Sequence, residues 1–76
     1  MIEAEVTLLL ANIEHVVQTE EVIHCWLLDN VGALAPHRDQ VDDNHPWCVT
    51  AKWAENIYHF AREQDATMFS LRWAGD

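Results

Sequence analysis

Turn-forming residues are scarce in this chain, and their scarcity limits the folds that it can adopt. Its 76 residues include only two glycines and two prolines. A many-stranded sheet needs such residues at its tight turns. Hydrophobic residues make up 50% of the sequence, which is enough for a packed core and argues against disorder. The composition therefore favours helices, and a chain this short has room for one domain, spanning residues 1–76.

The first segment has apolar residues at helical spacing. Over residues 2–17 one stripe of a helix collects Ile2, Val6, Leu9, Leu10, Ile13, Val16 and Val17. A strand is the alternative, because apolar and polar side chains alternate from Ile2 to Leu8. The helical pattern persists for sixteen residues, whereas the alternation breaks at Leu9, so we predict a helix.

A second helix is predicted from about residue 19 to residue 34. Thr19 is a suitable N-cap, and Glu20 and Glu21 suit the positive end of a helix dipole. Gly32 and Pro36 mark its end. Its inward face holds Ile23, Trp26, Leu27, Val31 and Leu34, while Val22, Cys25 and Leu28 widen the apolar coverage. The first two helices can also be read as one long kinked helix.

A polar, acidic loop over residues 35–45 precedes a third predicted helix. Pro46 suits a first helical position, where the missing amide costs nothing. The apolar stripe of this helix is Val49, Trp53, Ile57, Phe60 and Ala61. Residues 67–76 fit a helix, a strand or an irregular tail, and we favour helix or irregular tail. The predicted fold is all-α: a small three-helix domain, either a bundle or a helical hairpin plus a third helix.

The charge is strongly negative and unevenly distributed. The formal net charge is −9, and residues 1–35 contain no lysine or arginine. Direct binding of nucleic acid or of an anionic membrane draws on basic side chains, so both are disfavoured. A larger protein with a basic or functional surface is the expected partner.

The location predicted from the sequence is the cytoplasm. Met1 is followed by Glu3 and Glu5, where a secretory signal carries positive charge, and no apolar run approaches the roughly 20 residues that span a bilayer. Cys25 and Cys48 are then expected to be reduced thiols.

No metal, cofactor or catalytic site is predicted. His24, Cys25, His37, His45 and Cys48 are of the types that bind zinc, but their spacing does not form paired ligands. Cys48 with His45 could be imagined as a nucleophile and base, yet nothing else assembles around them. The acidic loop lacks the glycine and glutamate of a calcium loop.

The candidate partner-binding residues are exposed acids and tryptophans at the ends of elements. Trp26 and Trp53 are expected in the core. Trp47 and Trp73 flank elements, and we expect at least one of them at the surface, where tryptophan is enriched among binding hot spots. The full candidate set is Trp47, Trp73, Asp39, Asp42, Asp43, Glu20, Glu21 and Leu28.

These observations lead to one leading hypothesis and two alternatives. The first is a non-enzymatic inhibitor or modulator that covers a functional surface of a larger host protein, in the manner of small acidic inhibitors encoded by phages and mobile elements. The second is a DNA mimic that competes for a nucleic-acid-binding cleft. The third is a homo-oligomeric structural or antitoxin-like module, with the wide apolar face of the second helix as its dimer seam. Dimerisation is compatible with inhibition, so a homodimer is expected.

Overall fold

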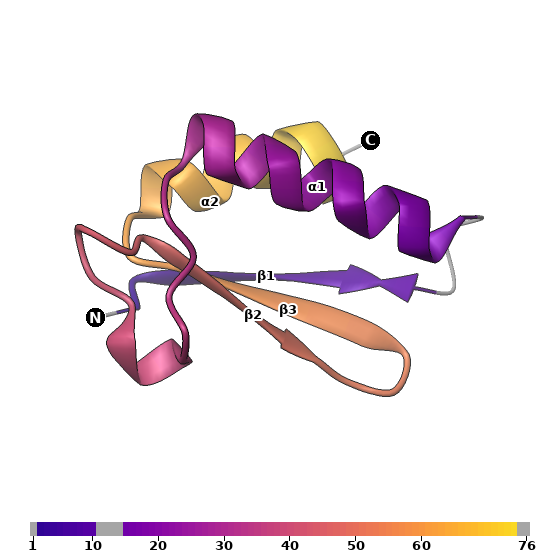
Figure 1. The fold of residues 1–76 in the computed structure, drawn as a ribbon, viewed down its shortest axis with the longest axis horizontal. Coiled ribbons are helices and arrows are strands. Elements are labelled where there is room, and N and C mark those ends of the chain that lie inside the picture. Colours follow the sequence, from indigo (N-terminus) through magenta and orange to yellow (C-terminus); the bar gives the residue numbers. More distant parts are fainter. Residues whose placement is uncertain (1, 11–14, 75–76) are drawn as a thin grey trace.

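The chain folds into a three-stranded sheet with two helices on one of its faces (Figure 1). The computed structural model describes residues 2–10 and 15–74. The sheet is antiparallel, with strand order β1-β3-β2. In chain order the elements are strand β1 (Ala4–Leu9), helix α1 (Val16–Asn30), 3-10 turn η2 (Arg38–Gln40), strands β2 (Trp47–Ala51) and β3 (Glu55–Phe60), helix α2 (Glu63–Phe69) and π-helical turn η3 (Ser70–Ala74).

The prediction of an all-α, three-helix domain is wrong, because residues 4–9 form a strand. β1 pairs with β3 along its whole length, from Ala4 opposite Phe60 to Leu9 opposite Glu55. The alternation that broke at Leu9 was therefore the informative pattern, since the strand ends there. Ile13 and Glu14, which belonged to the predicted helix, lie outside the described residues, and Val16 already belongs to α1.

The predicted third helix is also wrong, because residues 47–60 form the β2–β3 hairpin. The strands carry side chains with high strand propensity, including Val49, Thr50, Ile57 and Tyr58. The connecting turn contains no glycine or proline. The Lys52 amide donates to the Glu55 carbonyl at 2.8 Å and closes it.

The helix predicted in the second segment is present as α1, although it begins at Val16 and ends at Asn30. Because β1 is a strand, the alternative of one long kinked helix is wrong. Gly32 has a φ of +143°, a conformation that favours glycine, and it follows the helix where a stop was predicted. The tail continues as helix in α2 and η3, which agrees with the favoured reading. No helix in the described segments has the length and apolar character to cross a membrane.

The main core lies between the sheet and the two helices. Ile23 and Leu27 occupy one face of α1 and are fully buried. The Phe69 ring of α2 packs against Tyr58 and Phe60 of β3, with ring centroids 4.6 and 5.4 Å apart. Aromatic pairs at these separations add to the stabilisation from apolar burial. The core therefore joins residues that are far apart in sequence.

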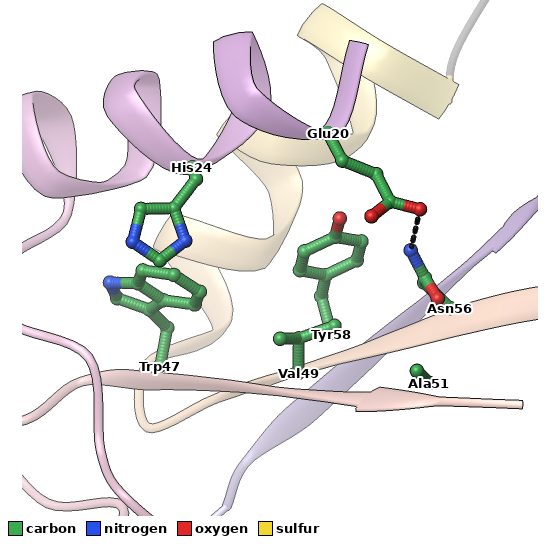
Figure 2. A pocket seen from close by; sticks show the side chains of 7 residues that line it. All are labelled: Glu20, His24, Trp47, Val49, Ala51, Asn56 and Tyr58. Atoms are coloured by element: carbon green, nitrogen blue, oxygen red, sulfur yellow. Dashed lines mark hydrogen bonds between the residues drawn. The ribbon is translucent and has the colours of Figure 1, made fainter. Parts of the chain in front are cut away.

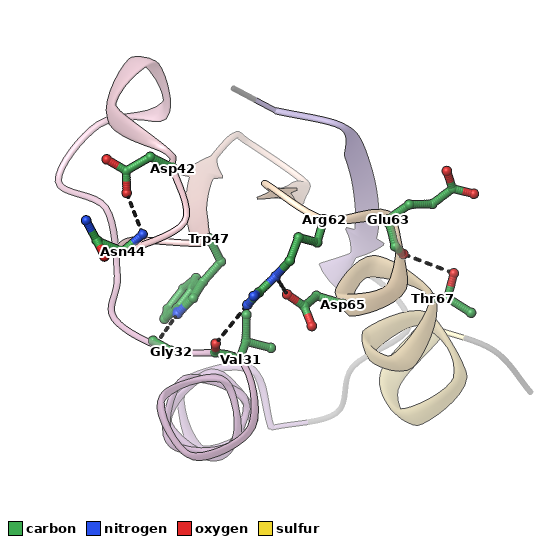
Figure 3. A network of polar contacts seen from close by, with 9 residues as sticks. All are labelled: Val31, Gly32, Asp42, Asn44, Trp47, Arg62, Glu63, Asp65 and Thr67. Atoms are coloured by element: carbon green, nitrogen blue, oxygen red, sulfur yellow. Dashed lines mark hydrogen bonds and ion pairs between the residues drawn. The ribbon is translucent and has the colours of Figure 1, made fainter.

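A polar network joins the end of α1 to the start of α2 and to β2 (Figure 3). The Arg62 guanidinium donates from Nε to Asp65 Oδ2 at 2.8 Å and from Nη2 to the Val31 carbonyl at 3.5 Å. The Trp47 indole donates to the Gly32 carbonyl at 2.8 Å. Two carbonyls just beyond α1 thereby gain side-chain donors, which positions that helix over the sheet.

The loop 35–45 covers one end of the second face of the sheet. Ala35, Val41, Cys48 and Ala61 form a small second core there, and Ile2 packs against it. The loop was predicted as an exposed connection, and its acidic side chains are exposed. The hairpin end of this face carries Thr7, Leu9, Thr50 and Ile57, and we call it the open face because Thr7 and Leu9 are exposed there.

Candidate functional site

The outer edge of β2 is the first part of the candidate site. The Lys52 amide donates to Glu55 of β3, and the Pro46 carbonyl accepts from Ala61, just after β3. Backbone direction alternates along a strand. The backbone groups of Trp47, Val49 and Ala51 therefore point outward. The Trp47 carbonyl accepts from the Ala35 amide at 2.8 Å, which confirms the direction. Among the described residues, the outward amides of Val49 and Ala51 have no acceptor, so this stretch of edge is unpaired.

A cleft runs beside this edge, between α1 and the sheet (Figure 2). Glu20 and His24 reach down from α1, and Asn56 and Tyr58 reach up from β3. The cleft is completed by Trp47, Val49 and Ala51 of β2. Its volume is about 110 Å³, which suits the end of one side chain, since pockets for drug-sized ligands hold about 300–1,000 Å³.

Among the described residues that line it, the cleft has one carboxylate, that of Glu20, and no lysine or arginine side chain. Glu20 Oε1 accepts from Asn56 Nδ2 at 3.3 Å, and the Tyr58 hydroxyl points toward α1 beside Glu20 (Figure 2). In the part of the chain that the structure describes, Glu20 has no ion pair. The cleft therefore offers a half-buried carboxylate to a cation.

The pKa of Tyr58 depends on its surroundings in the cleft. Burial raises the pKa of the Tyr58 phenol above its ordinary value, a hydrogen bond with Asn56 opposes the rise, and the negative charge of Glu20 adds to it. The phenol is therefore neutral at physiological pH. His24 closes the other end of the cleft, with its ring edge-on to Trp47 at a centroid distance of 5.3 Å.

Trp53 is the second part of the candidate site. It lies at the turn of the β2–β3 hairpin and is 99% exposed. The expectation that Trp53 belongs to the core is therefore wrong. The Leu10 amide donates to the Ala54 carbonyl at 3.0 Å, so the turn is tied to the end of β1. Leu9, which is 53% exposed, and Ile57 lie on the same open face of the sheet.

A polar chain crosses the open face beside the second core. The His59 Nδ1–H donates to Glu5 Oε2 at 2.6 Å, and Thr50 Oγ1 lies 2.8 Å from His59 Nε2. Hydroxyl, imidazole and carboxylate in this order also occur at nucleophilic active sites. Here the imidazole is only 2% exposed, and all three side chains come from adjacent strands of a sheet face. We interpret these hydrogen bonds as structural, because they give the buried His59 imidazole a partner at each nitrogen.

The predicted tryptophan anchors are not where the sequence placed them. Trp47 is fully buried, so the expectation of an exposed anchor is wrong; it forms the floor of the cleft instead. Trp73 is half-buried against Trp26, with ring centroids 6.4 Å apart, and the Arg72 guanidinium lies over its ring. The Trp73 indole nitrogen is buried and has no hydrogen-bond partner within the described segments.

The predicted acidic and apolar contacts lie in separate places. Glu20 lines the cleft, while its neighbour Glu21 is exposed on α1. Leu28 is exposed farther along the same helix. The structure therefore unites Glu20 with Trp47 and leaves the other predicted residues apart.

The three loop aspartates Asp39, Asp42 and Asp43 are exposed. Asp42 Oδ1 accepts from the amides of Asn44 and His45, and the bond from the His45 amide is the main cause that lowers the pKa of Asp42. This carboxylate organises its own loop.

Sequence reasoning missed His24, Trp53, Asn56 and Tyr58 as site residues. Trp53 lies on an apolar stripe when residues 46–61 are treated as a helix, and at a turn when they are treated as a hairpin. Only the interpretation as a hairpin predicts that Trp53 is exposed. His24, Asn56 and Tyr58 carried no local signal, because the cleft arises when α1 packs over the hairpin.

Within residues 2–10 and 15–74, no three His, Cys, Asp or Glu side chains gather closely enough to hold a metal ion. No family model, curated protein or solved structure matches this chain.

Proposed function

We propose that this protein is a non-enzymatic binding protein that docks on a larger protein and covers a basic or functional surface, so that it inhibits or modulates its partner. The observation that carries this proposal is Trp53, 99% exposed at a turn between two paired strands. A tryptophan in water forgoes burial of a large apolar surface, and tryptophan is enriched among the residues that dominate binding energy.

The surroundings of Trp53 support the same proposal. Near the hairpin turn that carries Trp53, Leu9 and Ile57 place apolar side chains on the open sheet face, and Glu5 and Glu55 lie on that face within the same strands. Interfaces commonly combine an apolar centre with a polar rim. The net charge of −9 favours a partner with a basic rim and accelerates the encounter with it.

Affinity capture with the full chain, followed by mass spectrometry of the bound protein, tests this function. Trp53→Ala should weaken binding of the captured partner by about 30-fold or more, which is the effect of losing a hot spot. Leu71→Ala is the matched control, because Leu71 is 74% exposed on η3. Failure to capture any saturable partner, or equal binding by both variants, contradicts the proposal.

Self-association is a second candidate, favoured by the outward face of α1. Val17, Val22 and Leu28 are exposed there, and Cys25 is also exposed. A dimer through this face would bury them. Light scattering at micromolar concentration should then give twice the chain mass, and Leu28→Glu should give the monomer mass. A wild-type monomer excludes this candidate.

We also place the protein in the cytoplasm. Cys25 and Cys48 are unpaired, as is common in a reducing compartment. Burial raises the pKa of the Cys48 thiol, which keeps it protonated and unreactive. Fractionation of the native host cell with an antibody to this chain tests the location; recovery outside the cytoplasm contradicts it.

A further inference from the structure

The unpaired edge of β2 and the acidic cleft beside it form one continuous surface. Val49 and Ala51 contribute their outward backbones to the edge and also line the cleft. A strand added to this edge would direct alternate side chains toward the helix face of the sheet, where the cleft lies. The edge and the cleft can therefore be occupied by one ligand.

A segment of this protein itself pairs with the β2 edge, but only over a short stretch. Leu34 forms a parallel bridge with Trp47, and the Ala35 amide donates to the Trp47 carbonyl at 2.8 Å. Pro36 comes next, and the chain then turns into η2 at Arg38 instead of continuing along β2. The β2 edge is thus paired at Trp47, and from Val49 to Ala51 it has no strand partner in the described parts of the chain.

The charge of the cleft selects the side chain that would enter it. Glu20 is half-buried, accepts one long hydrogen bond from Asn56 and has no cation beside it among the described residues. The Tyr58 oxygen lies next to it. A lysine or arginine side chain would supply a cationic donor to this carboxylate, since charge-assisted hydrogen bonds are among the strongest that proteins form.

From this geometry we infer that the β2 edge binds an extended segment of a partner protein by strand addition, and that a lysine or arginine of that segment enters the cleft and pairs with Glu20. The inference rests on the proposed function and specifies the kind of partner. Peptides bind sheet edges in this way, with the backbone providing affinity and a side-chain pocket providing specificity.

The length of the edge explains why a charged anchor is needed. Three residues span only about 10 Å, and the outward groups of Val49 and Ala51 allow few backbone hydrogen bonds. A second copy of this chain is a poorer occupant, because two chains of net charge −9 repel each other and would bring two Glu20 carboxylates together. A basic extended segment avoids both penalties.

A random 12-residue peptide library displayed on phage, selected against the immobilised full chain, tests the inference. We expect the enriched peptides to contain a lysine or arginine among β-branched residues. Synthetic versions of these peptides should shift the backbone amide resonances of Val49 and Ala51. An absence of enriched peptides, or binders that perturb other residues only, overturns the inference.

Two variants test the Glu20 anchor and the β2 edge independently of each other. Glu20→Gln should weaken the selected peptide by about tenfold or more, which is the effect of losing a hydrogen bond to a charged group. Glu21→Gln, the matched control with the same change in net charge, should stay within about twofold. Ala51→Pro removes an outward amide that is not part of the β2–β3 ladder, and it should weaken binding while circular dichroism stays unchanged.

The outcomes distinguish this inference from the proposed function. A protein partner that depends on Trp53 but is insensitive to Glu20→Gln and Ala51→Pro overturns the inference and leaves the proposed function standing. Peptides that bind the edge as described, with no protein partner captured, support the inference and contradict the proposed function.

Discussion

The buried imidazole of His59 shows how single residues set the local chemistry of this sheet. Its two nitrogens contact Glu5 on β1 and Thr50 on β2, so one side chain links all three strands. A buried polar group that loses its partner costs about 1–3 kcal/mol. The stability of the open sheet face therefore depends on these two contacts.

Thr50→Val should lower the free energy of unfolding by about 1–3 kcal/mol, because His59 Nε2 loses its partner while the side-chain volume is kept. Thr50→Ser keeps the hydroxyl and should cost about 1 kcal/mol or less, the value of one methyl group. Urea denaturation followed by tryptophan fluorescence measures both. Equal stability of the valine and serine variants would contradict the structural role.

Tyr58 is the single tyrosine of the chain, so its ionisation can be followed alone by absorbance near 295 nm. Because burial raises the pKa of Tyr58, the folded protein should titrate above the ordinary tyrosine value of 10.0, and the urea-unfolded chain near that value. The neutral phenol contributes stability that is complete below about pH 10 and is lost as the pH rises through the folded pKa.

The Tyr58→Phe variant checks the direction of this linkage. Its stability should fall less steeply than that of the wild type as the pH rises above about 10, because the variant has no phenol to ionise. Identical alkaline unfolding curves for the two proteins would show that Tyr58 titrates normally.

At the scale of elements, the position of α1 depends on the turn that follows it. Gly32 has a φ of +143°, and a Cβ atom there would lie 2.9 Å from Pro46 Cγ. The same turn presents the Gly32 carbonyl to the buried indole of Trp47. Helix and hairpin are therefore joined where α1 ends.

Gly32→Ala should destabilise the protein by about 1–3 kcal/mol from backbone strain alone, with the contact to Pro46 adding to it. Ala33→Ser, at the exposed neighbouring position, should change stability by about 0.5 kcal/mol or less. Thermal unfolding monitored by circular dichroism compares them. A Gly32→Ala variant as stable as the wild type would show that this turn adjusts freely.

At the scale of the whole molecule, self-repulsion is the main electrostatic effect. Thirteen acidic residues face only four lysines and arginines, and among the described residues Arg62 is the one of these four that forms a salt bridge. Repulsion between like charges destabilises a compact state, and salt screens it. This small acidic fold should therefore gain stability as ionic strength rises.

Raising NaCl from about 0.01 to 0.1 M shortens the Debye length from about 30 to about 10 Å, and the melting temperature should rise by a few degrees. Replacing the exposed acids Asp29 and Asp43 with asparagine should make the rise smaller. Differential scanning calorimetry measures both shifts. A melting temperature that falls with salt would show that attractive pairs dominate instead.

The sequence by itself determined the features that depend on nearby residues. It predicted a helix that overlaps α1 and ends near Gly32, although the expected cap residue Thr19 lies inside the helix, which begins at Val16. It also predicted the exposed acidic side chains of loop 35–45 and the acidic character of the protein. These signals act within a few residues of one another. The candidate site was predicted only in part: Glu20 was named, but its role in a cleft was not.

Only the tertiary structure decided whether residues 4–9 and 47–60 are strands. These strands carry apolar side chains on both faces, so that the spacing of apolar residues in the sequence matches a helical stripe. A strand forms its backbone hydrogen bonds only with a partner strand. For Ala4 that partner is Phe60, which is far away in the sequence. Trp47 and Trp53 exchanged their expected environments for the same reason, because burial followed from this long-range pairing.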